Sequence, residues 1–440
     1  MTSPYTPEFE HTDWPPAALF GHVPEGNSPN QVLHRVEAEF GNVADGFTEL
    51  AAADGALDTR LDALDARLAG IREAINALLA GRLPTTPDLP VSPGVGEDNS
   101  NRAILLDGAG GLVVFWTSRR VNNTFQVYGS RLDLARPGDG FSPAVTISGG
   151  SSGASGESAV LLPNGDLIVT YSRSPGGAVM KRAATLAGLA AASETQVSAA
   201  ASGSAGVVLA GGQVVFLVTG TSTNKRWAFR RYDPAARTFV DSTPLPFGPA
   251  THPPREPGPL HASVFGRFVW LAYYGTDTED QRFADVERLD AANGSLVSGG
   301  GLPDLMSTQY VQAVSETEAL VFYNASNGIR MVSAKANGSP SSTTVPGTDG
   351  WDYLPAAVRD TDGTISLCYI RSFTPTDAAV MVTRRSPRGD WGPRHRVNLR
   401  ALSSGVPQPV LVPGQGLWLV YGSHRTGDVD LYATRIITEI

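Results

Sequence analysis

The hydrophobic residues of this chain follow two different periods. Between Leu33 and Leu78 they recur at alternating gaps of three and four, which is the heptad pattern of a coiled coil. From about residue 100, apolar and polar residues alternate with a period of two, as in β-strands with one buried face. The pattern therefore predicts a helical segment followed by a mainly β region.

The heptad segment has an almost entirely apolar seam, interrupted only by Asp54. One seam position is held by Leu33, Phe40, Phe47, Asp54, Leu61, Leu68 and Ile75, and the other by Val36, Val43, Leu50, Leu57, Leu64, Ile71 and Leu78. Leucine and isoleucine at both positions favour three or more strands, so we predict a trimeric α-helical coiled-coil stalk over residues 28–82. The residues expected to hold the oligomer together are Leu57, Leu61, Leu64, Leu68, Ile71, Ile75 and Leu78. The alternative, a surface helix of a single domain, would show a wider apolar stripe of period 3.6.

Proline-rich segments lie on both sides of this stalk. Residues 1–27 contain five prolines and cannot form a core of their own, so we predict an extended docking arm. Its expected anchors are Tyr5, Phe9, Trp14 and Phe20. The alternative is a tail without fixed structure. On the other side, prolines recurring every third residue from Pro84 to Pro93 predict a stiff linker over residues 83–99.

The β region is built from repeats. A strongly apolar strand that follows a tight Gly- or Asn-rich turn recurs seven times, at spacings of 45 to 55 residues. These strands span residues 112–119, 167–173, 214–219, 268–274, 319–324, 364–371 and 417–422. Repeats near 50 residues with about four strands each are typical of a β-propeller, so we predict seven blades over residues 100–440, with six as the alternative. The last repeat ends after its third strand, at Ile436, and we expect the segment around Leu89–Val95 to supply the missing strand.

Charge and composition exclude several kinds of function. The net charge of −9 lies almost wholly in residues 1–83, which carry five arginines and thirteen acidic residues. A near-neutral β region with three lysines does not match a nucleic-acid surface. The single cysteine, Cys368, excludes a disulfide framework, and no pair of histidines has metal-ligand spacing, so we predict no metal and no cofactor. The first residues lack the basic and apolar parts of a secretory signal.

Two repeats share more than their period. Residues 116–120 (WTSRR) with 126–131 (QVYGSR), and residues 421–425 (YGSHR) with 430–435 (DLYATR), resemble each other and the repeats of sialidase-like β-propellers. Residues 137–141 (PGDGF) and 388–392 (RGDWG) lie where those proteins carry the Asp-box, between the third and fourth strands. The resemblance implies a propeller fold. A sialidase-type hydrolase would in addition need three arginines on the substrate carboxylate, a Tyr–Glu nucleophile pair and an acidic aspartate.

Arginines and aromatic residues are the candidate ligand-binding groups. Arg119, Arg173, Arg371 and Arg425 follow second strands, whose ends lie at one mouth of a propeller, and bidentate arginine suits carboxylates. The alternative is that each arginine closes its own blade by pairing with neighbouring backbone or carboxylate groups. Tyr274 and Trp351, with Tyr273 and Tyr353, are expected near blade edges, where they would either stack on sugars or fill gaps between blades.

The whole layout is similar to that of a tail fibre or receptor-binding protein of a bacteriophage or contractile injection particle. The resemblance implies a structural attachment protein rather than an enzyme: the arm docks on a particle protein, the stalk trimerises, and the heads bind a cell-surface ligand, plausibly a glycan. It would then be extracellular as part of the particle. The alternatives are a sialidase-like carbohydrate hydrolase and an intracellular scaffold propeller with a protein partner.

Overall fold

The chain divides into two compact units, residues 1–84 with 437–440, and residues 85–436. The computed structural model describes the second unit and, in the first, only Ala38, Gly41, Leu64, Arg67 and Leu68, all of them helical. Within 85–436 it leaves out residues 93–97, 122–123, 151, 200–204, 220–226, 249–255, 277–281, 303–308, 339, 375–376, 398–402 and 425–428. The predicted docking arm and the rest of the stalk seam lie outside the described residues, so the trimer stays a prediction.

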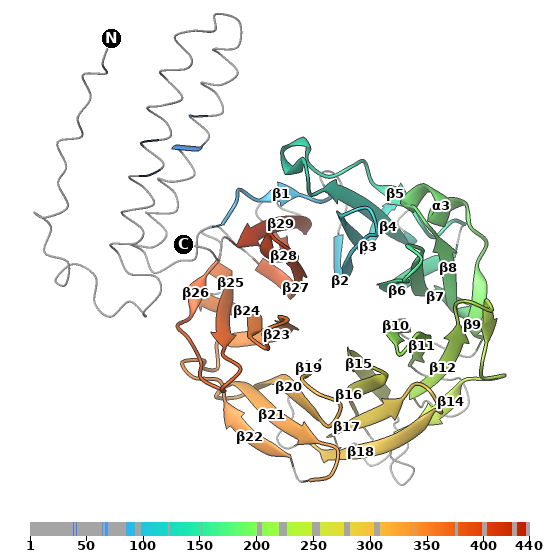
Figure 1. The fold of residues 1–440 in the computed structure, drawn as a ribbon. Coiled ribbons are helices and arrows are strands. Elements are labelled where there is room, and N and C mark those ends of the chain that lie inside the picture. Colours follow the sequence, from blue (N-terminus) through green and yellow to red (C-terminus); the bar gives the residue numbers. More distant parts are fainter. Residues whose placement is uncertain are drawn as a thin grey trace, which may run out of the picture. The chain divides into compact units, whose positions relative to one another are not determined.

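The second unit is mainly β and forms a seven-bladed β-propeller, as Figure 1 shows in a view down the central channel. The described strands pair antiparallel into seven sheets, each running from the channel outward. Blade 1 contains β2 (Asp98–Leu106), β3 (Gly111–Val121), β4 (Thr124–Asp133) and β5 (Val145–Thr146). Blade 2 contains β6 (Gly153–Leu161), β7 (Leu167–Ser174), β8 (Gly177–Ala183) and β9 (Thr195–Ser198). The six-bladed alternative is therefore wrong, because each repeat forms its own sheet.

The next four blades repeat this order, with small variations. Blade 3 contains β10 (Ala205–Ala210), β11 (Gln213–Val218) and β12 (Trp227–Asp233), and its outer edge is split into β13 (Thr238–Phe239) and β14 (Leu245–Phe247). Blade 4 contains β15 (Glu256–Phe265), β16 (Phe268–Thr276), β17 (Arg282–Asp290) and β18 (Ser295–Gly301). Blade 5 contains β19 (Gln309–Ala313), β20 (Glu318–Ala325), β21 (Gly328–Lys335) and β22 (Ser341–Thr344). Blade 6 contains β23 (Asp352–Arg359), β24 (Ile365–Thr374), β25 (Asp377–Arg385) and β26 (His395–Arg396).

Blade 7 closes the ring with a strand from the other end of the unit, as predicted. Its sheet has the order β1 (Leu89–Pro90), β29 (Asp430–Ile436), β28 (Gly416–Ser423) and β27 (Ser403–Val412). Hydrogen bonds extend the pairing on both sides of β1: the Thr86 amide donates to the Arg435 carbonyl at 2.9 Å, and the Val91 amide donates to the Leu431 carbonyl at 2.8 Å. The predicted linker is thus part of the propeller.

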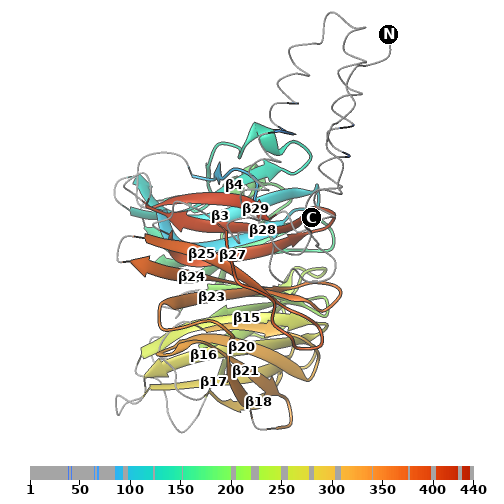
Figure 2. The ribbon, with the colours of Figure 1, turned by 90° about the vertical axis from the view of Figure 1, so that its left-hand side faces the viewer.

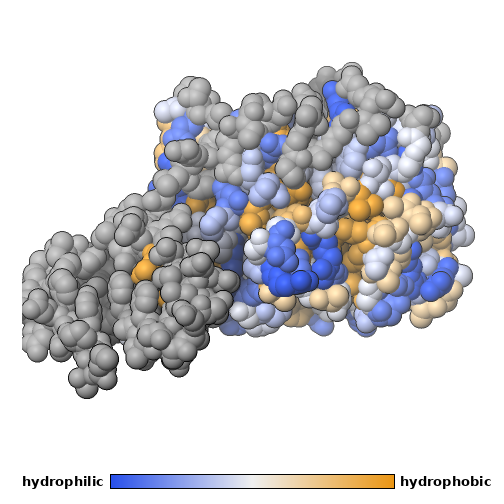
Figure 3. Space-filling view, turned by 90° about the horizontal axis from the view of Figure 1, so that it is seen from above, coloured by the Kyte–Doolittle hydropathy of each residue, from blue (hydrophilic) through white to orange (hydrophobic). Residues whose placement is uncertain are grey.

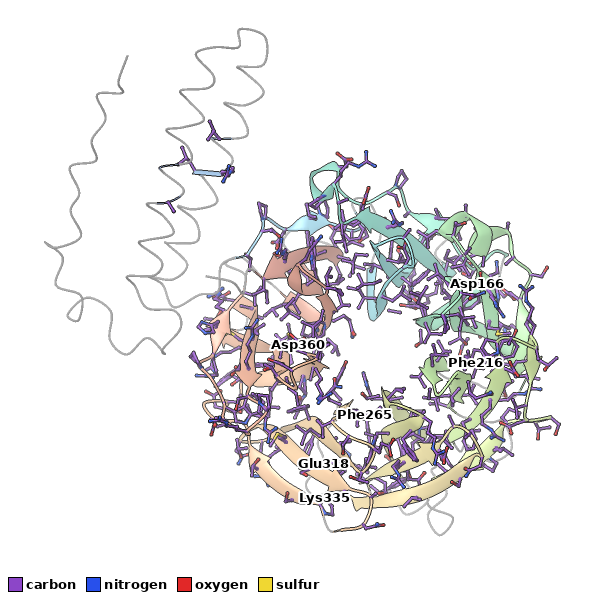
Figure 4. All side chains as sticks on the ribbon, in the orientation of Figure 1. Asp166, Phe216, Phe265, Glu318, Lys335 and Asp360 are labelled. Atoms are coloured by element: carbon purple, nitrogen blue, oxygen red, sulfur yellow. The ribbon has the colours of Figure 1, made fainter. Side chains whose placement is uncertain are left out.

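Between neighbouring blades lie apolar layers built from the second strands. Each second strand is buried on both faces, which explains its nearly continuous apolar sequence. Six of the seven carry a fully buried aromatic residue at the equivalent position near their end: Trp116, Tyr171, Tyr273, Tyr323, Tyr369 and Tyr421. Figure 4 shows side chains filling the space between sheets, as at the buried Phe216, and Figure 2 shows the strands of the ring from the side. These layers, rather than a single central core, hold the blades together.

The structure has one short helix that the sequence pattern did not predict. Helix α3 (Leu186–Ala191) lies in the connection between β8 and β9, and the Thr185 hydroxyl caps it by accepting a hydrogen bond from the Gly188 amide at 3.0 Å. A 3-10 turn, η2 (Pro137–Asp139), lies in the equivalent connection of blade 1. Over this part of the outer wall, hydrophilic residues are interspersed with smaller hydrophobic areas (Figure 3).

Candidate functional site

Successive turns of each antiparallel blade alternate between the two faces of the propeller. We call the face where the second strands end the second-strand face; the connections between blades lie on it as well. All candidate ligand-binding residues within the described parts lie on this face or just beneath it. Counted from the buried aromatic residue, Arg173 and Arg371 are two residues on, Arg119 three and Arg425 four. The four arginines therefore do not occupy one equivalent position.

Arg173 is fully engaged inside its own blade. Its guanidinium forms an ion pair with Glu194 and donates to the carbonyls of Gly149, at 2.5 Å, and Ser152, at 3.1 Å. Tyr171 also donates to Glu194, at 2.6 Å. Burial would raise the pKa of Glu194, but the hydrogen bonds from Arg173 and Tyr171 outweigh it and hold that pKa below its ordinary value. Arg173 thus ties the connection from blade 1 to the outer part of blade 2.

Arg371 occupies the same position in blade 6 and is engaged in the same way. It donates to Asp352 and to Asp349, both at 2.8 Å. Asp352 is 2% exposed, and burial raises its pKa, whereas the hydrogen bond from Arg371 lowers the pKa of Asp349. The structure therefore favours the alternative interpretation for both arginines: each closes its blade on the connection that enters it.

The other two arginines differ from this pair. Arg119 is exposed, and its guanidinium lies 4.0 Å from the centroid of the Phe125 ring. Arg425 lies outside the described residues. A cluster of three arginines facing one ligand carboxylate therefore has no support in the described part of the face.

The aromatic candidates also separate into buried and exposed groups. Tyr273 is fully buried, in agreement with the gap-filling alternative, and Tyr274 is half-buried against the apolar layer between blades 4 and 5. Trp351, in contrast, is 61% exposed. Phe373, which the sequence analysis missed, is 44% exposed on the same blade. The two segments are neighbours in the backbone, since the Ser372 amide donates to the Trp351 carbonyl at 3.0 Å. We call Trp351 and Phe373 the blade-6 aromatic pair.

Charged groups of both signs surround this pair. The Arg396 guanidinium lies 4.7 Å from the centroid of the Phe373 ring and pairs with Asp377 at 3.1 Å. Arg371 lies 5.7 Å from the same ring. Two large aromatic surfaces thus stand exposed among hydrogen-bonding groups whose charges largely balance. This arrangement can stack on an apolar ring face and bind hydroxyl groups beside it.

The backbone of β23, the inner strand of blade 6, is strained close to Trp351. Leu354 has a φ of 55°, and its amide donates to the Asn324 side chain of blade 5 at 3.0 Å. Gly156 and Gly405 take positive φ at the corresponding bulges of blades 2 and 7, with φ of 68° and 70°. A leucine in this conformation carries a steric cost that glycine avoids. The contact with Asn324 holds this bulge in place next to Trp351.

The predicted place of the two Asp-box-like segments is confirmed by local geometry. Residues 137–141 and 388–392 both lie between third and fourth strands. In each, the aromatic residue forms an isolated antiparallel β-bridge with the backbone of the third strand, Phe141 with Leu132 and Trp391 with Arg385. Cys368 is buried. Among the described residues, no three His, Cys, Asp or Glu side chains are grouped as metal ligands. No described helix is long and apolar enough to cross a membrane.

The comparisons with known proteins identify a fold rather than a family. No family model matches the chain, and no curated protein sequence matches it. Among solved structures, a fungal alcohol oxidase in complex with copper is similar at a TM-score of 0.54 and 12% identity, over 80% of this chain and 76% of the oxidase. An ulvan lyase bound to its glucuronate–rhamnose ligand is similar at a TM-score of 0.52 and 9% identity, over 79% of this chain and 95% of the lyase. A mutant sialidase from Streptococcus pneumoniae is similar at a TM-score of 0.50 and 9% identity, over 80% of this chain and 71% of the sialidase. The chain thus has a propeller fold similar to that of carbohydrate-active enzymes.

Proposed function

We propose that this chain is a receptor-binding protein whose propeller binds a cell-surface carbohydrate through the blade-6 aromatic pair. The observation that carries the proposal is the exposure of Trp351, at 61%, next to Phe373, at 44%. Large aromatic rings are costly to leave in water, and neighbouring exposed ones mark binding surfaces. The balanced charges of Arg371, Arg396 and their aspartate partners favour a neutral sugar ring over a strongly anionic one.

The engaged arginines support binding rather than hydrolysis. Arg173 and Arg371 are held by carboxylate and backbone groups of their own blades and the connections that enter them, so recruiting them to a substrate would break their ion pairs with Glu194 and Asp352. The predicted stalk gives the proposal its context. A trimer would present three heads, which converts weak single-site binding into avidity. Particle attachment through residues 1–27 remains part of the proposal.

The test uses the intact protein on a carbohydrate array and on chromogenic glycosides. Trp351→Ala and Phe373→Ala should each weaken glycan binding about tenfold or more, because each removes one stacking surface. Val240→Ala is the matched control, since Val240 is 49% exposed on blade 3, and it should bind like the unchanged protein.

Equal binding by all three variants would contradict the role of the aromatic pair. Glycoside turnover that is lost in Arg119→Ala would instead establish the hydrolase. Capture of a protein but no glycan would favour the scaffold.

A further inference from the structure

The apolar layer between blades 3 and 4 contains two carboxyl groups. Asp285 and Glu287 lie two residues apart on β17, so both point to the same face of the blade. That face packs on blade 3, because Phe283 and Leu289 of the same strand belong to the apolar cluster shared by the two blades. We call this region the blade 3–4 seam.

Asp285 and Glu287 are half-buried, and aromatic rings lie on the side of the seam that they face. The ring of Tyr273, on β16, lies with its centroid 4.4 Å from that of Trp227 and 5.7 Å from that of Phe247. Trp227, Phe247 and Tyr273 are all at most 3% exposed. The seam therefore has the low polarity of a hydrophobic core, in which a carboxylate is poorly stabilised.

No described cation compensates the two carboxyl groups. Neither Asp285 nor Glu287 forms an ion pair within the described residues, and Glu287 Oε2 is buried without a hydrogen-bond partner there. Two cations lie on the same strand, Arg282 and Arg288, and by alternation both point to the face opposite to the two carboxyl groups. Arg282 is exposed, and Arg288 donates to the Glu316 carbonyl of blade 5 at 2.8 Å.

Within the described residues, the elements of blade 3 that pack on the seam contribute uncharged groups. These are Trp227 from β12 and Phe247 and Gly248 from the β14 end. The arginines of β12, Arg230 and Arg231, are bound to Asp241 or to backbone carbonyls.

From this geometry we infer that the blade 3–4 seam is a proton-sensitive joint: it packs most firmly with Glu287 protonated and loosens when that carboxyl ionises. Gly248 is the point where loosening would reach the surface, because it covers both Trp227 and Tyr273 and begins the connection to blade 4. A charged Glu287 would draw water toward this end of the layer.

The surroundings of Glu287 raise its pKa, as this inference requires. Burial raises the pKa of Glu287 to about 7, the nearby Asp285 adds to the rise, and the Tyr273 hydroxyl and Gly248 amide oppose it only in part. Burial also raises the pKa of Asp285. Because the pKa of Glu287 is higher in the folded than in the unfolded chain, its protonation contributes to the free energy of unfolding. This contribution is fully present below pH 4.5, the ordinary pKa, and is lost as the pH rises toward 7. Above pH 7 no further change is expected.

His261 lies on the face of β15 that points away from the blade 3–4 seam, and its effect on stability has the opposite pH dependence to that of Glu287. Burial lowers its pKa to about 4, so its contribution grows as pH rises toward its ordinary value of 6.5. The stability of the unchanged protein therefore hides part of the effect of Glu287. Comparing variants at each pH removes the His261 contribution, because it is common to all of them.

The experiment measures unfolding of the full chain between pH 4.5 and 8.5 for the unchanged protein, Glu287→Gln and Glu318→Gln. Glu318 is the control, since its carboxylate accepts from Ser333 at 2.6 Å on blade 5. The quantity compared is the unfolded-to-folded ratio of the unchanged protein divided by the same ratio for Glu287→Gln at the same pH. We expect it to rise by up to about tenfold per pH unit until about pH 7 and then to stay constant. Glu318→Gln should show no such rise. A pH-independent difference for Glu287→Gln would overturn the inference.

A second measurement avoids the need for a folded variant. Hydrogen exchange of the unchanged protein, corrected for the intrinsic pH dependence of exchange, should be faster at pH 8 than at pH 5.5 in β14 and β16. Exchange in β24 of blade 6 should not change. Equal corrected protection of the seam at both pH values would also overturn the inference.

Discussion

At the residue scale, hydrogen-bond partners decide what each arginine does. Arg173 and Arg371 look like ligand-binding groups in the sequence, because they follow second strands that end at one mouth of the propeller. Each instead holds the connection that enters its blade: Arg173 donates to the carbonyls of Gly149 and Ser152, and Arg371 pairs with Asp349. Sequence position specified which face these side chains occupy but not which groups they contact.

This difference between arginines predicts different stabilities. The Arg173 side chain is 9% exposed, and Arg173→Ala removes its ion pair with Glu194 and two contacts with backbone carbonyls, so we expect it to lower the free energy of unfolding by about 2–3 kcal/mol. Arg119→Ala removes an exposed side chain and should change it by about 0.5 kcal/mol or less. Urea unfolding measures both. Equal effects of the two substitutions would show that Arg173 does not close its blade.

At the element scale, the ring depends on a very short strand. β1 contributes only Leu89 and Pro90 to the ladder of blade 7. Side chains strengthen this edge: the Leu431 amide donates to Ser92 Oγ at 3.0 Å, and the Thr434 hydroxyl donates to the Thr86 carbonyl at 2.8 Å. Because the first and last blades meet here, these contacts join sequence ends that are more than 330 residues apart.

This closure predicts that two truncations differ sharply. A chain that begins at residue 85 keeps every contact of β1 and should unfold in one cooperative transition. A chain that begins at residue 93 leaves the edge of β29 unpaired and should lose cooperativity or aggregate. Thermal unfolding followed by circular dichroism measures both. Indistinguishable transitions would mean that β1 is dispensable.

At the scale of the whole molecule, the heptad segment gives the clearest untested prediction. Leucine and isoleucine at both seam positions lead us to expect a trimer of the full chain in solution and a monomer when the chain begins at residue 85. Light scattering at working concentration measures both masses. A full-length monomer would remove the avidity argument, although the blade-6 aromatic pair would still be available for binding.

Much of this propeller could be predicted because its signals are local. The seven second strands, the turns before them and the missing strand of the last blade all follow from hydrophobic period and turn residues, and the structure confirms them. Helix α3 and the split outer edge of blade 3 carry no such signal, since they lie in connections whose form depends on packing against the rest of the blade.

The sequence by itself determined which elements form and in what order, because strand, turn and repeat depend on residues close together in the chain. Only the tertiary structure decided that Trp351 and Phe373 are both exposed on blade 6 while Tyr273 is buried near Glu287. Exposure and ionisation depend on neighbours that folding brings together from distant repeats, so these properties appear only when the blades pack.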